Sequence, residues 1–135
     1  MNVSFTVYGT PQPQGSTRAF MPKRGKNPIV TSDNARNKPW RQQVALTAQE
    51  YCRTPLARPE GVMVKVICFL KPPAKMPKGR TCPSCKPDVD KLLRSFLDAM
   101  SGIAYEDDSQ VVSAQILKVY GLPERAEISL ARAAS

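Results

Sequence analysis

This 135-residue chain has no histidine, few acidic residues and no long apolar run. The absence of histidine excludes a zinc site that depends on histidine ligands. The apolar runs are too short to cross a bilayer, and the N-terminus has no signal-peptide pattern. We therefore expect a cytoplasmic protein that does not enter membranes. No internal repeat and no low-complexity segment is present.

Only two of the four cysteines, Cys82 and Cys85, have a spacing that could bind zinc. Disulfides are not the default in the cytoplasm, and Cys68 lies in an apolar strand pattern, so we expect it in the core. Cys82-Pro-Ser-Cys85 has the spacing of a zinc knuckle, but it supplies only two of four ligands. The pair is either an ordinary part of a loop or half of a zinc site that two copies of the chain share.

The chain is strongly basic, with 20 Lys and Arg against 11 Asp and Glu, a formal net charge of +9 and a pI of about 9.7. This excess predicts a polyanionic partner, with nucleic acid ahead of an anionic membrane surface. A membrane partner would require a basic amphipathic helix or a lipidation motif, and the sequence contains neither.

The length fits one domain over residues 1–135 with one hydrophobic core. The expected fold class is mixed α/β (α+β), with a mixed sheet of about four strands packed against two main helices. Expected strands cover residues 3–8, 62–70, 110–120 and 126–131, and the last two are expected to form a hairpin around the turn at 121–124. Expected helices cover residues 39–52 and 89–100, and a short hairpin is expected within 18–31.

Individual residues predict where the helices begin and end and which side chains are buried. Asn37 and Pro39 mark a helix start with Asn as the cap, and Trp40 should pack on the sheet rather than stack on a base. The run from Val62 to Leu70 is apolar on both faces apart from one lysine, which predicts a central strand covered on both sides. Gly102 should end the second helix in the left-handed conformation.

Residues 71–86, the basic loop, are rich in proline and lysine and contain no acidic residue. The loop is either a flexible linker or a mobile flap that grips phosphates, and its position directly before two aspartates favours the flap. A second basic tip lies at residues 23–26, where a phosphate contact and a solvated loop are equally plausible. The expected DNA-contacting residues are Arg18, Lys23, Arg24, Lys75, Lys78, Arg80, Lys86 and Lys91.

Five of the eleven acidic residues form two groups, Asp88 with Asp90 and Glu106-Asp107-Asp108. Taken alone, Asp88 and Asp90 are better explained by a helix cap and a first-turn acid than by a metal site. The second group precedes a strand and so has no expected capping duty; its alternative is a solvated turn. A helix that returns antiparallel to the next strand should bring Asp107 or Asp108 near Asp88 and Asp90. Such carboxylates would repel unless Mg²⁺ or Mn²⁺ sat between them.

A metal held by aspartates can activate water for attack on a phosphodiester and stabilise the leaving 3′ oxygen. Arg94, one helical turn beyond Asp90, is a candidate for the scissile phosphate, with Lys91 as a second candidate. The alternative for Arg94 is an ordinary helix-surface ion pair with Asp90 or Asp98.

The segments Lys86-Pro-Asp-Val-Asp-Lys-Leu-Leu-Arg94, Leu97-Asp-Ala-Met100 and Gly102 to Val112 together resemble the RusA family of Holliday junction resolvases. The opening Gly9-Thr-Pro-Gln-Pro-Gln-Gly-Ser16 is similar to phage-type members. The resemblance implies a small homodimer that cleaves four-way DNA junctions with Mg²⁺, for which Mn²⁺ can substitute. It also implies that Asp88, Asp90 and Asp108 are essential carboxylates with Asp107 close by.

Two positions depart from the family pattern. The family's catalytic lysine falls at Arg94, and Lys91 stands where asparagine is usual. Since arginine does not give up a proton, Arg94 can stabilise charge but is a poor general acid. Three alternatives remain: a broader nuclease for flaps, forks or duplex DNA, a non-catalytic DNA- or RNA-binding module, and a zinc-dependent interaction module.

Overall fold

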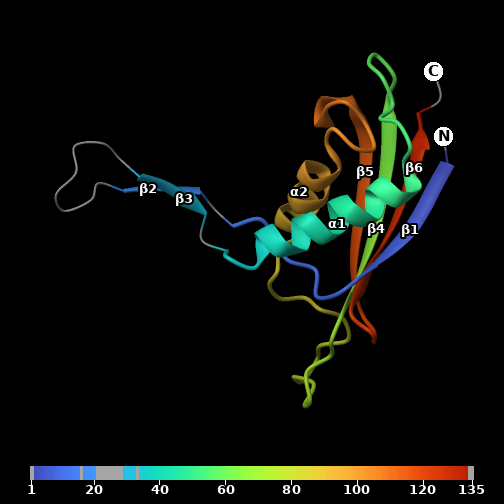
Figure 1. Ribbon diagram of the computed structural model, residues 1–135. Coiled ribbons are helices and arrows are strands. Elements are labelled where there is room, and N and C mark those ends of the chain that lie inside the picture. Colours follow the sequence, from blue (N-terminus) through green and yellow to red (C-terminus); the bar gives the residue numbers. More distant parts are fainter. Residues whose placement is uncertain (1, 16, 21–28, 33, 134–135) are drawn as a thin grey trace.

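The structure is a computed structural model that describes residues 2–15, 17–20, 29–32 and 34–133 (Figure 1). It is a single α+β unit with a four-stranded mixed sheet and two helices, which confirms the expected fold class. Its elements in chain order are β1 (Asn2–Tyr8), β2 (Thr17–Phe20), β3 (Ile29–Ser32), α1 (Asn37–Tyr51), β4 (Val62–Leu70), α2 (Val89–Met100), the 3₁₀ turn η1 (Asp108–Gln110), β5 (Val111–Tyr120) and β6 (Arg125–Arg132).

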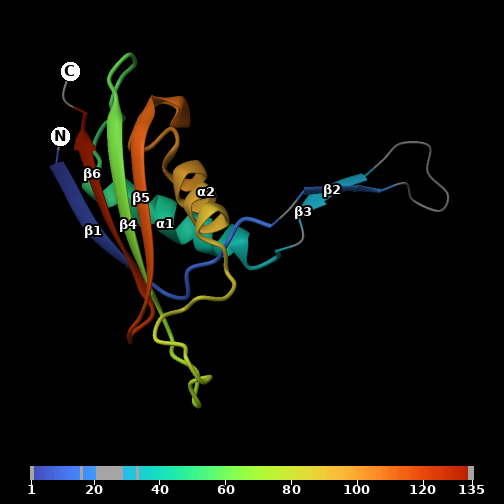
Figure 2. The same cartoon turned by 180° about the vertical axis from the view of Figure 1, so that it is seen from behind.

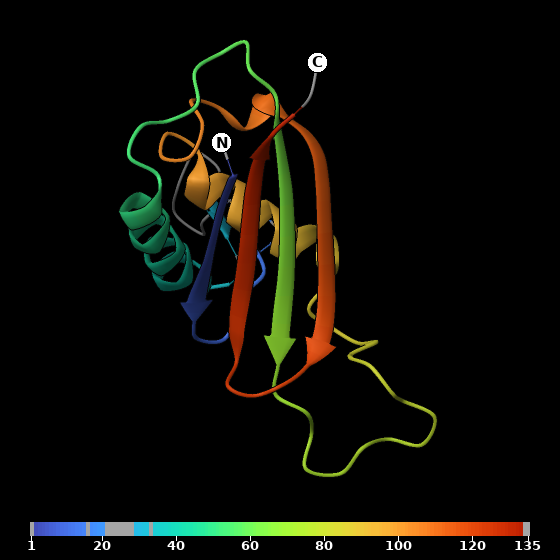
Figure 3. The ribbon, with the colours of Figure 1, turned by 90° about the vertical axis from the view of Figure 1, so that its right-hand side faces the viewer.

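The strand order of the main sheet is β1-β6-β4-β5, as Figure 3 shows with the sheet facing the viewer. β4 pairs parallel with β5, and β6 runs antiparallel to both β4 and β1. The central place of β4 is confirmed. The expected hairpin of residues 110–120 with 126–131 is wrong, because β4 lies between β5 and β6.

The helix α2 between β4 and β5 makes their pairing a parallel crossover, so β5 occupies one edge of β4. The chain then passes over the end of β4, and β6 pairs with the other edge of that strand. Gly121 lies in this passage, and its N–H donates to Leu70 O at 2.9 Å. A Cβ at Gly121 would lie 2.8 Å from Cδ1 of Phe69, so the crossing leaves no space for a side chain.

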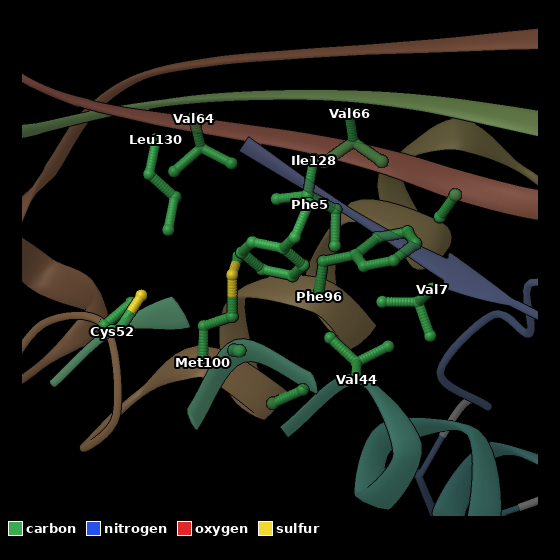
Figure 4. Packing of buried hydrophobic residues seen from close by; sticks show 14 of the residues in the cluster. Phe5, Val7, Val44, Cys52, Val64, Val66, Phe96, Met100, Ile128 and Leu130 are labelled. Atoms are coloured by element: carbon green, nitrogen blue, oxygen red, sulfur yellow. The ribbon is translucent and has the colours of Figure 1, made fainter. Parts of the chain in front are cut away.

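Both helices cover the same face of the sheet, and the core lies between these two layers (Figures 1 and 4). Phe5 and Val7 of β1, Val64 and Val66 of β4 and Phe96 of α2 are among its buried residues. The buried Trp40 meets Phe96 edge-on with ring centroids 5.9 Å apart, which confirms a packing role for the tryptophan. Cys68 is in the core as expected, and burial raises the pKa of its thiol to about 12.

The opposite face of the sheet is largely uncovered by the described residues. Met63 of β4 is 41% exposed and Leu117 of β5 is 50% exposed on this face. The expectation that both faces of β4 would be covered is therefore wrong for a single chain. The alternation of buried and exposed residues along β4 instead follows the helix-covered and open faces.

The predicted short hairpin is present as β2 and β3, which pair antiparallel from Thr17 with Ser32 to Phe20 with Ile29. It extends away from the sheet and helices beyond the start of α1 (Figure 2). The expected DNA contacts Lys23 and Arg24, and the side chain of Arg18, lie outside the described residues. Within the part of the chain that is described, no helix is long and apolar enough to span a bilayer.

The helix ends follow the sequence with one correction. Gly102 has φ +82° directly after α2, as expected for a left-handed helix stop. Asn37 is not the side-chain cap of α1: the cap position is Arg36, and Asn37 is buried inside the first turn. Its Nδ2 donates to Oγ of Ser95 on α2 at 2.8 Å, so this amide joins the two helices instead.

Candidate active site

Asp88 and Asp90 lie at the start of α2, directly after the basic loop. Asp88 occupies the cap position in an extended conformation, yet its side chain makes no capping hydrogen bond. Asp90 is in the first turn, and both residues are exposed. The explanation of Asp88 as an ordinary helix cap therefore fails, and its carboxylate is left to face solvent at the positive end of the helix.

Residues with cationic side chains lie on both sides of Asp88 and Asp90 in the sequence. Lys86 precedes Asp88, and Lys91 and Arg94 follow on α2. Arg94 is exposed, and among the described residues it forms no ion pair with Asp90 or Asp98. The helix-surface ion pair offered as its alternative role is thus absent, and its guanidinium faces solvent.

The N-terminal loop after β1 packs against the start of α2. The N–H of Gln14 donates to Lys91 O at 3.0 Å, and Nδ2 of Asn34 donates to Pro13 O at 2.6 Å. Together these segments enclose the aspartate pocket, a hollow of about 410 Å³ whose lining includes Gln14, Asn34, Lys86, Pro87, Asp88 and Lys91. A carboxylate and two cationic side chains around one hollow suit a metal ion next to a phosphate.

Lys118 of β5 ties the end of the basic loop to the sheet. Its Nζ donates to Cys85 O at 2.6 Å and to Pro87 O at 2.8 Å, on either side of Lys86 and directly before Asp88. Lys118 is not among the site residues predicted from the sequence. The signal was present, since Lys118 is a lysine on the helix-facing side of an expected strand, where an apolar residue is usual.

The second acidic group has a capping duty, contrary to expectation. Asp107 caps the 3₁₀ turn η1, and its carboxylate accepts the N–H of Ser109 at 2.9 Å. Hydrogen bonds from the side chain and backbone of Ser109 lower the pKa of Asp107 below its ordinary value, and Arg58 acts in the same direction. The carboxylate of Asp107 is therefore engaged in local structure.

The side chain of Gln110 holds this acidic turn against the segment that contains Leu56 and Glu60. It is buried; its Oε1 accepts the N–H of Asp107 at 2.9 Å, and its Nε2 donates to Leu56 O at 2.9 Å and Glu60 O at 3.0 Å. Gln110 is likewise not among the residues predicted from the sequence. Asp108, by contrast, has an exposed side chain that forms no hydrogen bond or ion pair with other described residues, while its backbone carbonyl accepts the N–H of Val111.

The two acidic groups do not meet within one chain. Asp88 and Asp90 are at the beginning of α2, whereas Asp107 and Asp108 lie beyond its end, and a helix of 12 residues is about 18 Å long. Among residues 2–15, 17–20, 29–32 and 34–133, no group of three or more His, Cys, Asp or Glu side chains is arranged to hold a metal ion. The expected convergence is wrong for a single chain. A strand that returns along a helix brings its end, not its start, to the helix N-terminus, and Lys118 occupies that place.

The basic loop itself contains no helix or strand. Lys75 and Lys78 are exposed on it, and Arg80 is half-buried. Cys82 and Cys85 are exposed free thiols, and the described part of the chain brings no third metal-binding side chain to them. A zinc site completed within one chain is therefore not formed there.

Comparison with known proteins connects this arrangement to a family. Residues 10–131 match the family described as endodeoxyribonuclease RusA. The chain is also similar to YqaN, an uncharacterized protein of Bacillus subtilis (strain 168), with 34% identity over 137 residues that cover 95% of this chain and 94% of that protein. The matched region contains both acidic groups and the whole basic loop. The chain therefore belongs to the RusA family of endodeoxyribonucleases.

Proposed function

We propose that the protein is a Mg²⁺-dependent, structure-selective endodeoxyribonuclease that resolves Holliday junctions during recombination and repair in the cytoplasm. The observation that carries this proposal is the carboxylate of Asp88, which sits at a helix cap position without capping the helix. It lines the aspartate pocket together with Lys86 and Lys91. Asp90, two residues further along, offers further oxygen ligands, and Arg94 follows one turn later on α2. The family match supplies the DNA-cleaving chemistry.

The carboxylates at the start of α2 suit a hard cation. Carboxylate oxygens are the ligands that Mg²⁺ and Mn²⁺ prefer, and no histidine competes for a softer metal. When bound, the ion would supply an activated water for attack on phosphorus. Asp88 and Asp90 would hold the ion, Lys86 would orient the phosphate, and the guanidinium of Arg94 would stabilise the charge that develops during cleavage.

We further propose that Asp108 reaches this site from a second copy of the chain. Asp108 is exposed and separated from Asp88 by the length of α2, so a shared ion requires the two groups to come from different protomers. A two-fold dimer would then contain two equivalent sites, each with Asp88 and Asp90 from one copy and Asp108 from its partner. Two symmetric sites suit a four-way junction, where two strands must be cut.

Mixing two inactive variants tests this arrangement. Asp90→Asn and Asp108→Asn should each abolish cleavage of a labelled four-way junction. In a mixed dimer one site receives both lesions and the other receives none, so co-refolded equimolar variants should regain about one quarter of the wild-type sites. If each site were built from one chain, every site would carry one lesion and the mixture would stay inactive.

Cleavage itself is tested with a four-way junction and a linear duplex of equal length, with and without Mg²⁺ or Mn²⁺. The proposal predicts metal-dependent cleavage of the junction in preference to the duplex. Asp90→Asn should lose cleavage but keep junction binding, because its neighbours Lys86 and Lys91 remain. Equal cleavage of both substrates would favour a broader nuclease, and cleavage retained by Asp90→Asn would contradict the assigned role.

A further inference from the structure

A second hollow lies next to the aspartate pocket. This loop pocket, of about 370 Å³, is enclosed by the N-terminal loop, the basic loop and the ends of β4 and β5. Pro13, Lys86 and Pro87 line both pockets, so they form the wall between them. Whatever occupies the loop pocket therefore lies beside the phosphate proposed to sit near Asp88.

The lining of the loop pocket combines rigid apolar walls with cationic side chains. Leu70 and Tyr120 are paired neighbours on β4 and β5 and form the wall at the end of the sheet. Prolines from both loops make the other walls. Lys71, Arg80 and Lys86 supply positive charge. The single acidic residue of the lining, Glu124, accepts a hydrogen bond from Oγ1 of Thr10 at 3.1 Å.

This combination matches one chemical class of ligand. An aromatic ring and apolar walls suit the flat face of a nucleobase, and the cationic side chains suit the phosphates on either side of it. The prolines restrict the backbone of both loops, so the hollow exists before a ligand arrives.

We propose that the loop pocket binds one unpaired nucleotide of the DNA, stacked on Tyr120, next to the phosphate to be cut. This inference rests on the proposed nuclease function and adds a source of selectivity to it. Removing a base from a continuous duplex costs unpairing and unstacking energy, whereas a bulged base is already unpaired and base pairs next to a branch point open more readily. The pocket would therefore favour branched or bulged DNA over continuous duplex without reading any sequence.

The test measures binding rather than cleavage, in the Asp90→Asn background. Two linear duplexes of equal length are compared by fluorescence anisotropy, one fully paired and one with a single extra unpaired nucleotide. We expect the bulged duplex to bind about tenfold more tightly, in keeping with the usual strength of base–aromatic stacking. Equal affinity for the two duplexes would overturn the proposal.

Two controls separate the pocket from other causes of such a preference. Replacing the unpaired nucleotide by an abasic one should return the affinity to that of paired duplex, and this control does not depend on the folding of any variant. Tyr120→Ala should also remove the preference while affinity for paired duplex changes by less than about twofold, and Tyr120→Phe should keep it. A preference that survives both the abasic nucleotide and Tyr120→Ala would show that the pocket takes no base.

These outcomes are independent of catalysis. A protein that fails to cut junctions would contradict the proposed nuclease function yet could still show the bulge preference. A protein that cuts junctions but binds both duplexes equally would retain the nuclease function and lose only the base pocket.

Discussion

At the scale of single residues, the same side chain performs different tasks at similar positions. Asp88 and Asp107 both stand at cap positions, the first before α2 and the second before η1. Asp107 accepts the N–H of Ser109 and so completes its turn, whereas Asp88 makes no such bond. From sequence the cap role was assigned to the wrong group, because capping depends on backbone geometry that residue type alone does not reveal.

Gln110 allows a direct test of how the acidic turn is held. We expect Gln110→Leu to lower the free energy of unfolding by about 2–3 kcal/mol, because it leaves Asp107 N–H and the carbonyls of Leu56 and Glu60 without their partner. Urea unfolding followed by circular dichroism would measure the change. Gln49→Leu, at an exposed position of α1, is the matched control and should change stability by less than about 0.5 kcal/mol. Equal losses in the two variants would contradict this role.

At the scale of elements, hydrogen bonds from the end of β5 fix the end of the basic loop. Lys118 is bonded to carbonyls on both sides of Lys86, so the strand determines where the loop ends and Asp88 begins. The loop was predicted from composition, but its attachment to a strand more than thirty residues later in the chain was not visible there.

Lys118→Met should therefore impair catalysis more than DNA binding. We expect cleavage about 10- to 100-fold slower, together with a higher Mg²⁺ concentration for half-maximal rate, because Asp88 loses its fixed starting position. Junction cleavage across a Mg²⁺ titration would measure both quantities. Lys65→Met, at an exposed position of β4 on the open face of the sheet, is the control and should leave the Mg²⁺ dependence unchanged. An unchanged Mg²⁺ dependence in Lys118→Met would argue against a positioning role.

The passage of the chain over β4 gives a second prediction at this scale. Gly121→Ala should destabilise the protein by about 1–3 kcal/mol, because the new Cβ would lie 2.8 Å from Cδ1 of Phe69. Thermal unfolding of a double-mutant cycle with Phe69→Ala would measure the coupling. In the Phe69→Ala background the cost of Gly121→Ala should largely disappear, since the conflicting ring is gone; an equal cost in both backgrounds would locate the strain elsewhere.

At the scale of the whole molecule, the basic loop lies beside the two exposed carboxylates of Asp88 and Asp90. The basic loop extends beyond the ends of β4 and β5, next to the start of α2 (Figure 3). The net charge of +9 favours DNA in general, whereas Asp88 and Asp90 form a local exception at which a cation can be held.

The contribution of the basic loop can be measured through salt dependence. If Lys78 contacts a phosphate, Lys78→Gln should reduce the slope of log affinity against log salt concentration by about 0.9. Fluorescence anisotropy with linear duplex over a range of NaCl concentrations would give the slope. Lys65→Gln, on the open face of the sheet, should leave it unchanged. A slope unaffected by Lys78→Gln, or equally affected by both changes, would place the DNA elsewhere.

The sequence by itself determined the main helices and strands, core residues such as Trp40 and Cys68, the glycine stop at Gly102 and the family. These features depend on local periodicity and on motifs that are contiguous in the chain, so they can be read without coordinates. Only the tertiary structure decided the strand order and the end of α2 at which each acidic group lies. Strand partners and the meeting of distant side chains depend on the path of the whole chain, which is why Lys118, and not Asp108, lies beside the start of α2 within one protomer.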